Sequence, residues 1–220
     1  MGRLVIVTGV ATEIGKTHLA VALVEAARAR GWSVAGYKPV ESGLDGSTPG
    51  DASALLEAST FRVEPAPLYA FAPPVSPHLA AEWSEHPIQP KRIVAAVRAA
   101  LPRVDLMVVE LAGGLFTPLA PGTDNADLAL ALEPSSIVLV AVDALGVLHH
   151  TRAAALAADA RGLPRAHLAL VEPSSHDAST GYNTAPLVRS FVSIVPIPRA
   201  SRAALARSEA IAELLEAFVR

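Results

Sequence analysis

Residues 3–31, RLVIVTGVATEIGKTHLAVALVEAARARG, carry the pattern that decides the fold. The first seven residues form a short apolar run typical of a buried strand, and the segment from Lys16 to Gly31 has the periodicity of an amphipathic helix. A glycine-containing turn joins the two segments. This is the context of a phosphate-binding loop, because backbone N–H groups at a helix N-terminus can hold phosphate oxygens.

The spacing of this loop differs from the commonest phosphate-binding motif. In G-x-x-x-x-G-K-[ST] four residues separate the two glycines, whereas five residues separate Gly9 from Gly15 here, and Val10 takes the place of the usual first glycine. In such a loop Lys16 reaches the β- and γ-phosphates and the Thr17 hydroxyl ligates Mg²⁺. The alternative is an ordinary strand-to-helix turn with an incidental Gly-Lys-Thr, and it leaves the agreement of strand, loop and helix unexplained.

The rest of the chain alternates apolar runs with helical patterns. Strand patterns occur at residues 33–39, 104–111, 136–142 and 166–172. Helical patterns occur at residues 126–133, 147–162 and 208–220. This alternation predicts one α/β domain over residues 1–220, with a doubly wound, mostly parallel sheet like that of P-loop NTPases. The proline-rich segment 63–90 contains aromatic and apolar residues, so we expect an ordered excursion above the sheet and not a linker.

Composition narrows the class of protein. A length of 220 residues fits one domain with a full hydrophobic core. No apolar run approaches the ~20 residues of a membrane-spanning helix, and the chain opens on a strand-like run and not on a secretory leader. We therefore expect a cytoplasmic protein that does not contact membranes. The lack of cysteine excludes disulfides and cysteine-based zinc sites, and a net charge of −3 gives no overall attraction to nucleic acid.

Lysine is rare in this sequence, which draws attention to each one. The 18 basic residues comprise 15 arginines and three lysines, Lys16, Lys38 and Lys91. A compact ammonium that reaches a phosphate oxygen is a role that arginine does not fill equally well. The surroundings of Lys16 and Lys38 predict such a role, whereas Lys91 in QPKRIV is expected to be a surface residue.

Two carboxylates are candidate partners for the metal ion. Mg²⁺ prefers oxygen ligands and keeps several waters, so one or two carboxylates should accompany Thr17. Glu110 ends a buried strand, where a lone carboxylate is unfavourable unless it pairs or binds a metal. Asp51, in GDASALL, precedes a helix and has an alternative role as its N-cap. Asp51 and Glu110 are thus the predicted metal ligands, with the role of helix cap left open for Asp51.

Taken in order, these motifs resemble those of one family. The segments GVATEIGKT, AGYKPVESG, SPH and VELAGGLFTPL are similar to those of the dethiobiotin synthetases, the ATP-dependent carboxylases of biotin synthesis. The loop of that family also has five residues between its glycines, so the spacing from Gly9 to Gly15 is a variant of the motif. The resemblance is most specific in the loop and in GYKPV, extends to about Thr151 and fades after Arg161.

The resemblance implies a homodimer that converts 7,8-diaminononanoate and carbon dioxide to a cyclic urea, with Mg²⁺ and ATP as the nucleoside triphosphate. A carbamate formed on one amine attacks the γ-phosphate, and the second amine closes the ring of the carbamic-phosphoric anhydride. Lys16 and Lys38 would stabilise the developing negative charge, the largest contribution in phosphoryl transfer. Thr12 and Glu13 in the loop would orient the substrate and a neighbouring basic group, and Ser42 would hydrogen-bond the carbamate or the amine.

The resemblance also implies binding segments for the nucleotide and for the tail of the substrate. The nucleotide is expected to contact Glu13, Ile14, Gly15, Lys16, Thr17, His18, Pro173 and Pro198. A helix N-terminus, in the family that of the partner subunit, is expected to bind the substrate carboxylate through the free amides of Gly146, Val147, Leu148 and His149. The adjacent histidines are not expected to form a metal site, because neighbouring residues of a helix point to different faces.

Four residues depart from the pattern of the family. Ala11 stands where the family often has an aspartate, and Leu111 replaces a glycine, which leaves the backbone after Glu110 less free. His149 replaces an asparagine, so only the backbone part of that contact is expected. Pro173 takes the place of an asparagine that reads adenine, so we expect weak discrimination between nucleotide bases.

Two other functions remain open at this point. A nucleotide-dependent switch of the partition or positioning type would share the fold and the dimer. Such ATPases usually carry another lysine early in the loop, where Val10 and Ala11 stand here. An amide-forming ligase of the cobyric or cobyrinic acid type would resemble the loop, but those enzymes carry a glutaminase module with a cysteine nucleophile.

Overall fold

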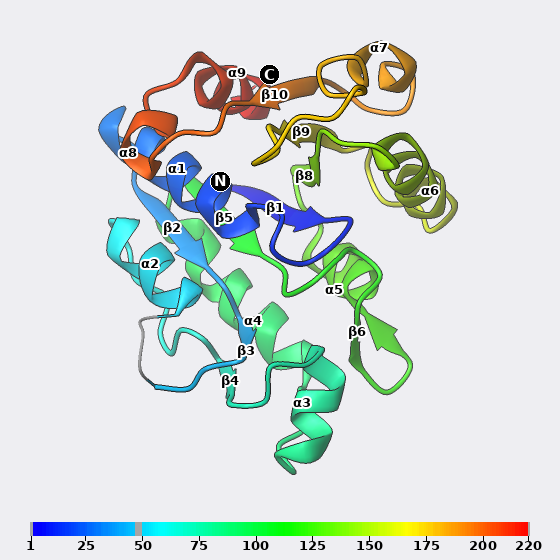
Figure 1. Cartoon of the computed structure of the whole chain (residues 1–220). Coiled ribbons are helices and arrows are strands. Elements are labelled where there is room, and N and C mark those ends of the chain that lie inside the picture. The colour runs from blue at the N-terminus through cyan, green and yellow to red at the C-terminus, as the bar shows by residue number, and fades with distance from the viewer. Residues whose placement is uncertain (1, 47–49, 220) are drawn as a thin grey trace.

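A six-stranded parallel sheet forms the centre of the computed structural model, which describes residues 2–46 and 50–219 (Figure 1). The strand order is β10-β9-β8-β1-β5-β2, and each pairing within it is parallel. The strands are β1 (Arg3–Gly9), β2 (Val34–Tyr37), β5 (Leu106–Glu110), β8 (Ser136–Val142), β9 (His167–Val171) and β10 (Ile194–Ile197). The predicted doubly wound α/β fold is confirmed.

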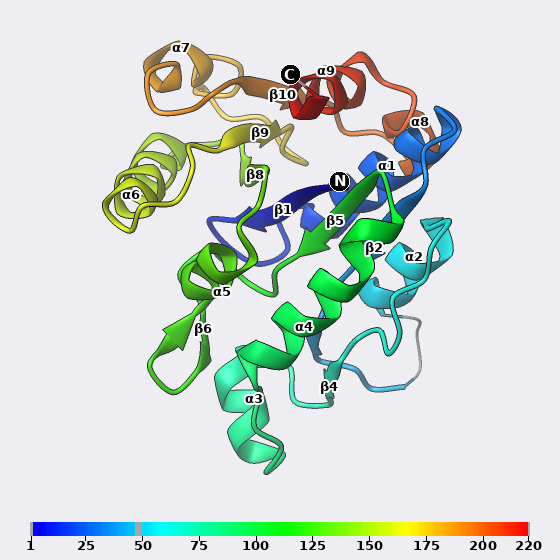
Figure 2. The ribbon, with the colours of Figure 1, turned by 180° about the vertical axis from the view of Figure 1, so that it is seen from behind.

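Helices cover both faces of this sheet. One face carries α1 (Lys16–Ala29), α2 (Asp51–Ala58), α8 (Arg202–Leu205) and α9 (Glu209–Val219). The other face carries α4 (Pro90–Ala100), α5 (Asn125–Leu132) and α6 (Val147–Ala160), with the short α7 (Thr184–Leu187) near α6. Seen from behind, α4 lies across its face of the sheet (Figure 2).

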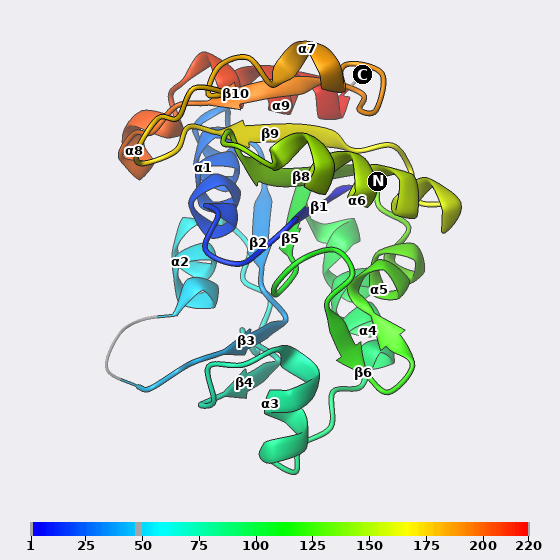
Figure 3. The same ribbon diagram turned by 45° about the vertical axis from the view of Figure 1, so that its right-hand side comes forward.

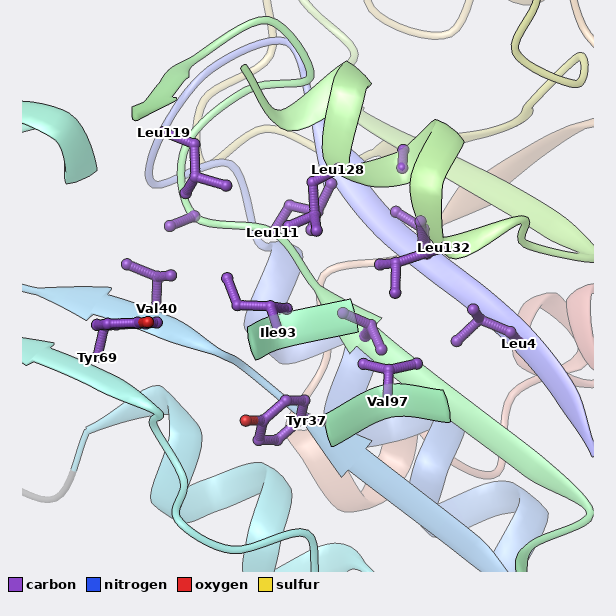
Figure 4. Packing of buried hydrophobic residues seen from close by; sticks show 14 of the residues in the cluster. Leu4, Tyr37, Val40, Tyr69, Ile93, Val97, Leu111, Leu119, Leu128 and Leu132 are labelled. Carbon is purple, nitrogen blue, oxygen red and sulfur yellow. The ribbon is translucent and has the colours of Figure 1, made fainter. Parts of the chain in front are cut away.

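Alternating residues of each central strand pack on opposite faces. Along β1, Leu4 and Ile6 belong to the core beneath α4 and α5, whereas Val5 and Val7 belong to the core beneath α1. Figure 4 shows the first of these cores, where Ile93 of α4 lies near Tyr37 of β2. Burial on both faces explains why these strands read as continuous apolar runs in the sequence.

A smaller layer extends beyond the carboxyl end of β2 (Figure 3). There β3 (Val40–Ser42) pairs in parallel with β4 (Tyr69–Phe71), and α3 (Pro77–Trp83) follows. This layer confirms that the proline-rich segment is ordered. A 3-10 turn (Leu101–Arg103) follows α4, and an antiparallel hairpin of β6 (Pro118–Ala120) and β7 (Thr123–Asp124) precedes α5.

The register of the central strands brings distant parts of the chain together at one edge. Val7 of β1 lies beside Glu110 of β5, and Tyr37 of β2 lies beside Val109. The residues that follow β1 and β2 therefore meet the end of β5. None of the helices in the described part of the chain has both the length and the apolar character needed to span a bilayer.

Candidate active site

The loop after β1 lines a cleft of about 440 Å³ at the carboxyl ends of the central strands. Gly15, with φ of 90°, is the N-cap of α1, and Glu13 also has a left-handed backbone with φ of 56°. The positive φ of Gly15 suits glycine, since a side chain is disfavoured in that region. The Nζ atom of Lys16 donates to the carbonyl of Ala11 at 2.7 Å. The start of α1 thus presents Lys16 and Thr17 to the cleft.

A chain of hydrogen bonds joins three of the predicted residues across the sheet. Thr17 Oγ1 donates to Glu110 Oε1 at 2.8 Å, and Lys38 Nζ donates to the same oxygen at 3.0 Å. Lys38 also forms an ion pair with Asp51. Glu110 is only 1% exposed and Lys38 only 7%. Side chains from α1, α2 and the ends of β2 and β5 therefore meet in one group, in which Lys38 and Glu110 are buried and Asp51 is about half exposed.

Burial and charge act in opposite directions on this group. Burial raises the pKa of Glu110 above its usual value, although the Lys38 ammonium opposes the change. Burial alone would lower the pKa of Lys38, but Glu110 and Asp51 outweigh it and raise that pKa. Burial lowers the pKa of Lys16. For Asp51, burial is outweighed by Lys38, which lowers the pKa of the carboxyl group. Lys38 is accordingly held as an ammonium between two carboxylates.

The donor set of this group fits Mg²⁺. Thr17, Asp51 and Glu110 offer oxygen atoms only, which is the ligand type that Mg²⁺ prefers. Among the described residues, the Oε2 atom of Glu110 is buried without a hydrogen-bond partner, as expected of an oxygen available to a cation. No group of three or more His, Cys, Asp or Glu side chains is placed to hold a metal in those same ranges. A site here therefore relies on one hydroxyl and two carboxylates, with water completing the shell.

The structure excludes one of the two roles considered for Asp51, that of helix cap. Helix α2 begins at Asp51, and its N-cap, Gly50, has no side chain to cap it. The carboxylate of Glu41 instead accepts hydrogen bonds from the backbone N–H groups of Asp51, at 2.6 Å, and Ala52, at 3.0 Å. Asp51 is thus not the helix cap, and its side chain faces Lys38.

Other predicted residues line the same cleft, and one residue that the sequence did not reveal supports its wall from behind. Thr12, Glu13 and Ser42 line the cleft, and Ser42 Oγ donates to the carbonyl of Val75 at 2.7 Å. The buried Asn125 at the start of α5 donates from Nδ2 to the carbonyls of Ala112 and Gly114, at 2.8 and 2.9 Å. Asn125 therefore fixes the turn after β5, which forms one wall of the cleft. An isolated asparagine at a helix start gives no local sign of such a role.

Pro173 and Pro198, which lie outside the loop and are predicted to bind the nucleotide, line a second cleft of about 430 Å³ beside the first. Its walls include Glu13, Ile14, Gly15, His18, Pro173 and Pro198. Polar side chains at this cleft bond to the protein itself. His18 Nε2 lies 3.0 Å from the carbonyl of Ala200, and Glu172 accepts from the backbone N–H of Arg199 at 2.9 Å. The remaining wall is largely apolar.

The N-terminus of α6 differs in part from the expectation. Gly146 is its N-cap, with φ of 96°, but two of the four expected amides are engaged within the chain. The N–H of Val147 donates to Ala144 and that of His149 to Gly146, both at 3.1 Å. Of the four backbone N–H groups expected to bind the substrate carboxylate, those of Gly146 and Leu148 therefore remain candidates.

The two adjacent histidines, His149 and His150, are exposed, with ring centroids 5.8 Å apart. Together with the loop residues from Val10 to Thr12 they line a third cleft, of about 590 Å³. The start of α6 thus adjoins the outer side of the phosphate loop.

Comparisons with known proteins agree with this geometry. The sequence model of the AAA domain family matches residues 3–206. The chain is 41% identical over 187 residues to the ATP-dependent dethiobiotin synthetase BioD of Anaeromyxobacter dehalogenans strain 2CP-C, covering 83% of each chain. It is 38% identical over 156 residues to BioD 1 of Escherichia coli K12, covering 68% of this chain and 69% of the relative.

Solved structures share the fold at low identity. The ParA family ATPase of Chlorobium tepidum is 13% identical, with a TM-score of 0.58 over 98% of this chain and 92% of that one. The cell division ATPase MinD of Pyrococcus furiosus is 17% identical, with a TM-score of 0.58 over 99% of this chain and 100% of that one. At these identities the likeness establishes the P-loop NTPase architecture alone.

Proposed function

The chain belongs to the dethiobiotin synthetase family, and on that premise we propose that it joins carbon dioxide to 7,8-diaminononanoate, with cleavage of ATP, to form dethiobiotin. One observation carries the proposal at the level of the site. Thr17 and Lys38 both donate to Glu110, so an ammonium and oxygen-bearing side chains meet beside the glycine-containing loop, which supports the proposal. That is the arrangement a carbamate needs in order to attack a γ-phosphate under charge stabilisation.

The proposed reaction has three steps that balance in atoms and charge. One substrate amine adds to carbon dioxide and loses a proton, which gives a carbamate. A carbamate oxygen then attacks the γ-phosphorus, and the bond from that phosphorus to the oxygen that bridges it to the β-phosphate breaks. ADP leaves, and the substrate is now a carbamic-phosphoric anhydride. The second amine attacks the carbamoyl carbon, the bond from that carbon to the phosphate oxygen breaks, and the proton lost by the amine leaves with the phosphate, which closes the cyclic urea.

The residues of the cleft divide these tasks. Lys16, at the start of α1, would hold the phosphates, and Lys38, on the opposite wall, would stabilise charge on the carbamate and on the transferring phosphoryl group. The contacts with Glu110 and Asp51 keep Lys38 protonated, which supports this role. Ser42 would hold the carbamate or the amine.

Thr17, Asp51 and Glu110 would hold Mg²⁺. When bound, the ion supplies positive charge that neutralises the phosphate oxygens. The loop residues Thr12 and Glu13 would orient the substrate.

The remaining parts of the proposal rest on the family resemblance. The substrate carboxylate would bind at the start of α6 of a partner subunit, through the amides of Gly146 and Leu148, in a homodimer. The use of ATP supports a cytoplasmic location.

A nucleotide-dependent switch is the rival function, because its members share this fold. The test measures the release of ADP by the purified chain with ATP and Mg²⁺ in four mixtures. They contain diaminononanoate alone, bicarbonate alone, both compounds, or neither. A synthetase releases ADP severalfold faster only when both are present. A switch releases ADP at one rate in all four mixtures, which would refute the proposal.

A further inference from the structure

Glu41 has a structural role that neither its sequence context nor the proposed reaction explains. It lies in β3, is only 6% exposed, and directs its carboxylate at the first turn of α2. Its Oε1 atom accepts from the N–H of Asp51 and its Oε2 atom from the N–H of Ala52. These two donors would otherwise be unsatisfied at a helix start. A residue from another element thus caps the helix that carries Asp51.

Gly50, the residue before α2, supports the role of Glu41 as the cap of that helix. Gly50 has φ of −73° and ψ of 174°, an extended conformation that any residue can adopt, so its backbone does not require glycine. A Cβ at this position, however, would lie 2.7 and 2.8 Å from the two carboxylate oxygens of Glu41. The lack of a side chain at Gly50 is therefore what lets a distant carboxylate replace the usual local cap.

The capping arrangement determines what Asp51 can do. A helix that starts with an aspartate and lacks a capping side chain at its N-cap commonly uses local polar groups to satisfy its first amides. Because Glu41 satisfies the amides of Asp51 and Ala52, the Asp51 carboxylate is free of that role and forms its ion pair with Lys38. The orientation of Asp51 toward Lys38 thus depends on the first turn of α2.

We propose that Glu41 is the positioning residue for Asp51: by capping α2 it fixes the Asp51 carboxylate as a ligand of the divalent cation. The proposal rests on the assignment of Asp51 to the metal site under the proposed function. The rival role is direct contact between Glu41 and the substrate, since Glu41 also lines the cleft that contains Lys38 and Ser42.

The positioning role and the substrate-contact role of Glu41 predict different results when the cap of α2 is moved from Glu41 to position 50. Glu41→Ala removes the cap and the two carboxylate oxygens that a Cβ at position 50 would meet. The remaining close neighbour of such a Cβ is the Cδ2 atom of Leu44 at 2.8 Å, the end of a flexible side chain that can shift. Gly50→Ser then places a hydroxyl at an N-cap whose extended backbone suits serine. The double variant E41A/G50S therefore restores a cap without restoring the carboxylate. In the wild-type background, G50S alone brings a Cβ against Glu41 and serves as the matched control.

The experiment measures binding of Mn²⁺, a probe that takes the same oxygen ligands as Mg²⁺, by electron paramagnetic resonance in the presence of ADP. No diamine or bicarbonate is present, so the result does not depend on the reaction that the enzyme catalyses. Loss of a residue that orients a metal ligand typically weakens metal affinity by about 10–100-fold, which is the change expected for E41A. E41A/G50S should regain most of the affinity, and G50S alone should lose part of it.

Two further measurements keep the outcome decisive. Thermal unfolding of each variant reports whether α2 and the fold persist. Glu41→Gln, which keeps the size of the side chain but presents an NH₂ group to one of the two amides, provides the test if E41A does not fold, and it should also weaken Mn²⁺ binding. Wild-type affinity in E41Q, or in a folded E41A, would overturn the proposal. So would a folded E41A/G50S that binds Mn²⁺ as weakly as E41A.

The readouts also separate this proposal from the proposed function. If E41A weakens Mn²⁺ binding but no dethiobiotin forms with the wild-type chain, the positioning role stands and the reaction is wrong. If dethiobiotin forms and E41A binds Mn²⁺ normally, the reaction stands and the positioning role is wrong.

Discussion

The two neighbouring clefts that would hold a nucleotide are built in opposite ways. In the cleft for the phosphates, charged side chains from separate elements face one another, as Lys38 and Glu110 do at 3.0 Å. In the second cleft, at the ends of β9 and β10, His18 lies 3.0 Å from the carbonyl of Ala200, and Glu172 accepts from the backbone N–H of Arg199. Under the proposed function, this difference leads us to expect that affinity and chemistry reside in the cleft lined by Lys38 and Glu110, while the second cleft supplies mainly apolar contact to the base.

Removal of the Lys38 ammonium should have the largest effect. We expect Lys38→Ala to lower turnover by about 10²–10³-fold, because its charge matters most as negative charge develops on the transferring group. The Michaelis constant for ATP should change much less. Steady-state kinetics measure both, and Lys91→Ala, which removes an exposed lysine, is the matched control. Turnover within about threefold of wild type in Lys38→Ala would remove this residue from the mechanism.

Removal of Lys16 should weaken nucleotide binding as well as turnover. Its ammonium would contact phosphates in the ground state too, and a hydrogen bond to a charged group contributes about 1.5–3 kcal/mol, so affinity for ATP should fall by about 10–100-fold in Lys16→Ala. Calorimetric titration with ATP and Mg²⁺ measures this change directly. Unchanged affinity for ATP in a folded variant would contradict the assignment.

Changing the base of the nucleotide should have a smaller effect. Pro173 has no amide with which to read adenine, so CTP and GTP should support the reaction within roughly tenfold of ATP in kcat/KM. The four nucleoside triphosphates are compared side by side in the same assay. A thousandfold preference for ATP would show that backbone groups near Glu172 or Pro198 read the base, and the contrast between the two clefts would fail.

A side-chain amide introduced at position 173 should slightly increase the preference for ATP over CTP. Pro173→Asn places a donor and an acceptor in the wall of this cleft. One amide pair contributes about 1–3 kcal/mol to the choice between bases, and imperfect placement should leave a gain of severalfold in favour of ATP over CTP. The ratio of the two kcat/KM values measures it, with turnover on saturating ATP as the control. No gain would indicate that position 173 does not contact the base.

Local patterns were sufficient to predict the centre of the fold and to single out Lys38 and Glu110, which the structure brings together. The strand that ends in Gly9 is a continuous apolar run, because its residues pack on both faces of the sheet, and the helix that follows has clear periodicity. Lys38 directly follows β2, and Glu110 ends β5 of the same parallel sheet. Since such ends share one edge, their meeting follows once the fold is known.

Local sequence patterns did not predict contacts between residues that lie far apart in the chain. Glu41 caps a helix that begins ten residues later, and nothing near Gly50 in the sequence indicates a distant cap. The engaged amides of α6 depend on a turn at Ala144, which helical periodicity does not report. Strand β10 contains Pro196, which argues against a strand, but β10 lies at the edge of the sheet, where proline is tolerated.

The most direct test of the account is the product of the complete reaction. The purified chain is incubated with ATP, Mg²⁺, diaminononanoate and ¹³C-labelled bicarbonate, and the products are identified by mass spectrometry. The account predicts dethiobiotin that carries the label in its cyclic urea, formed in step with ADP. ADP formed without any labelled cyclic urea would contradict it.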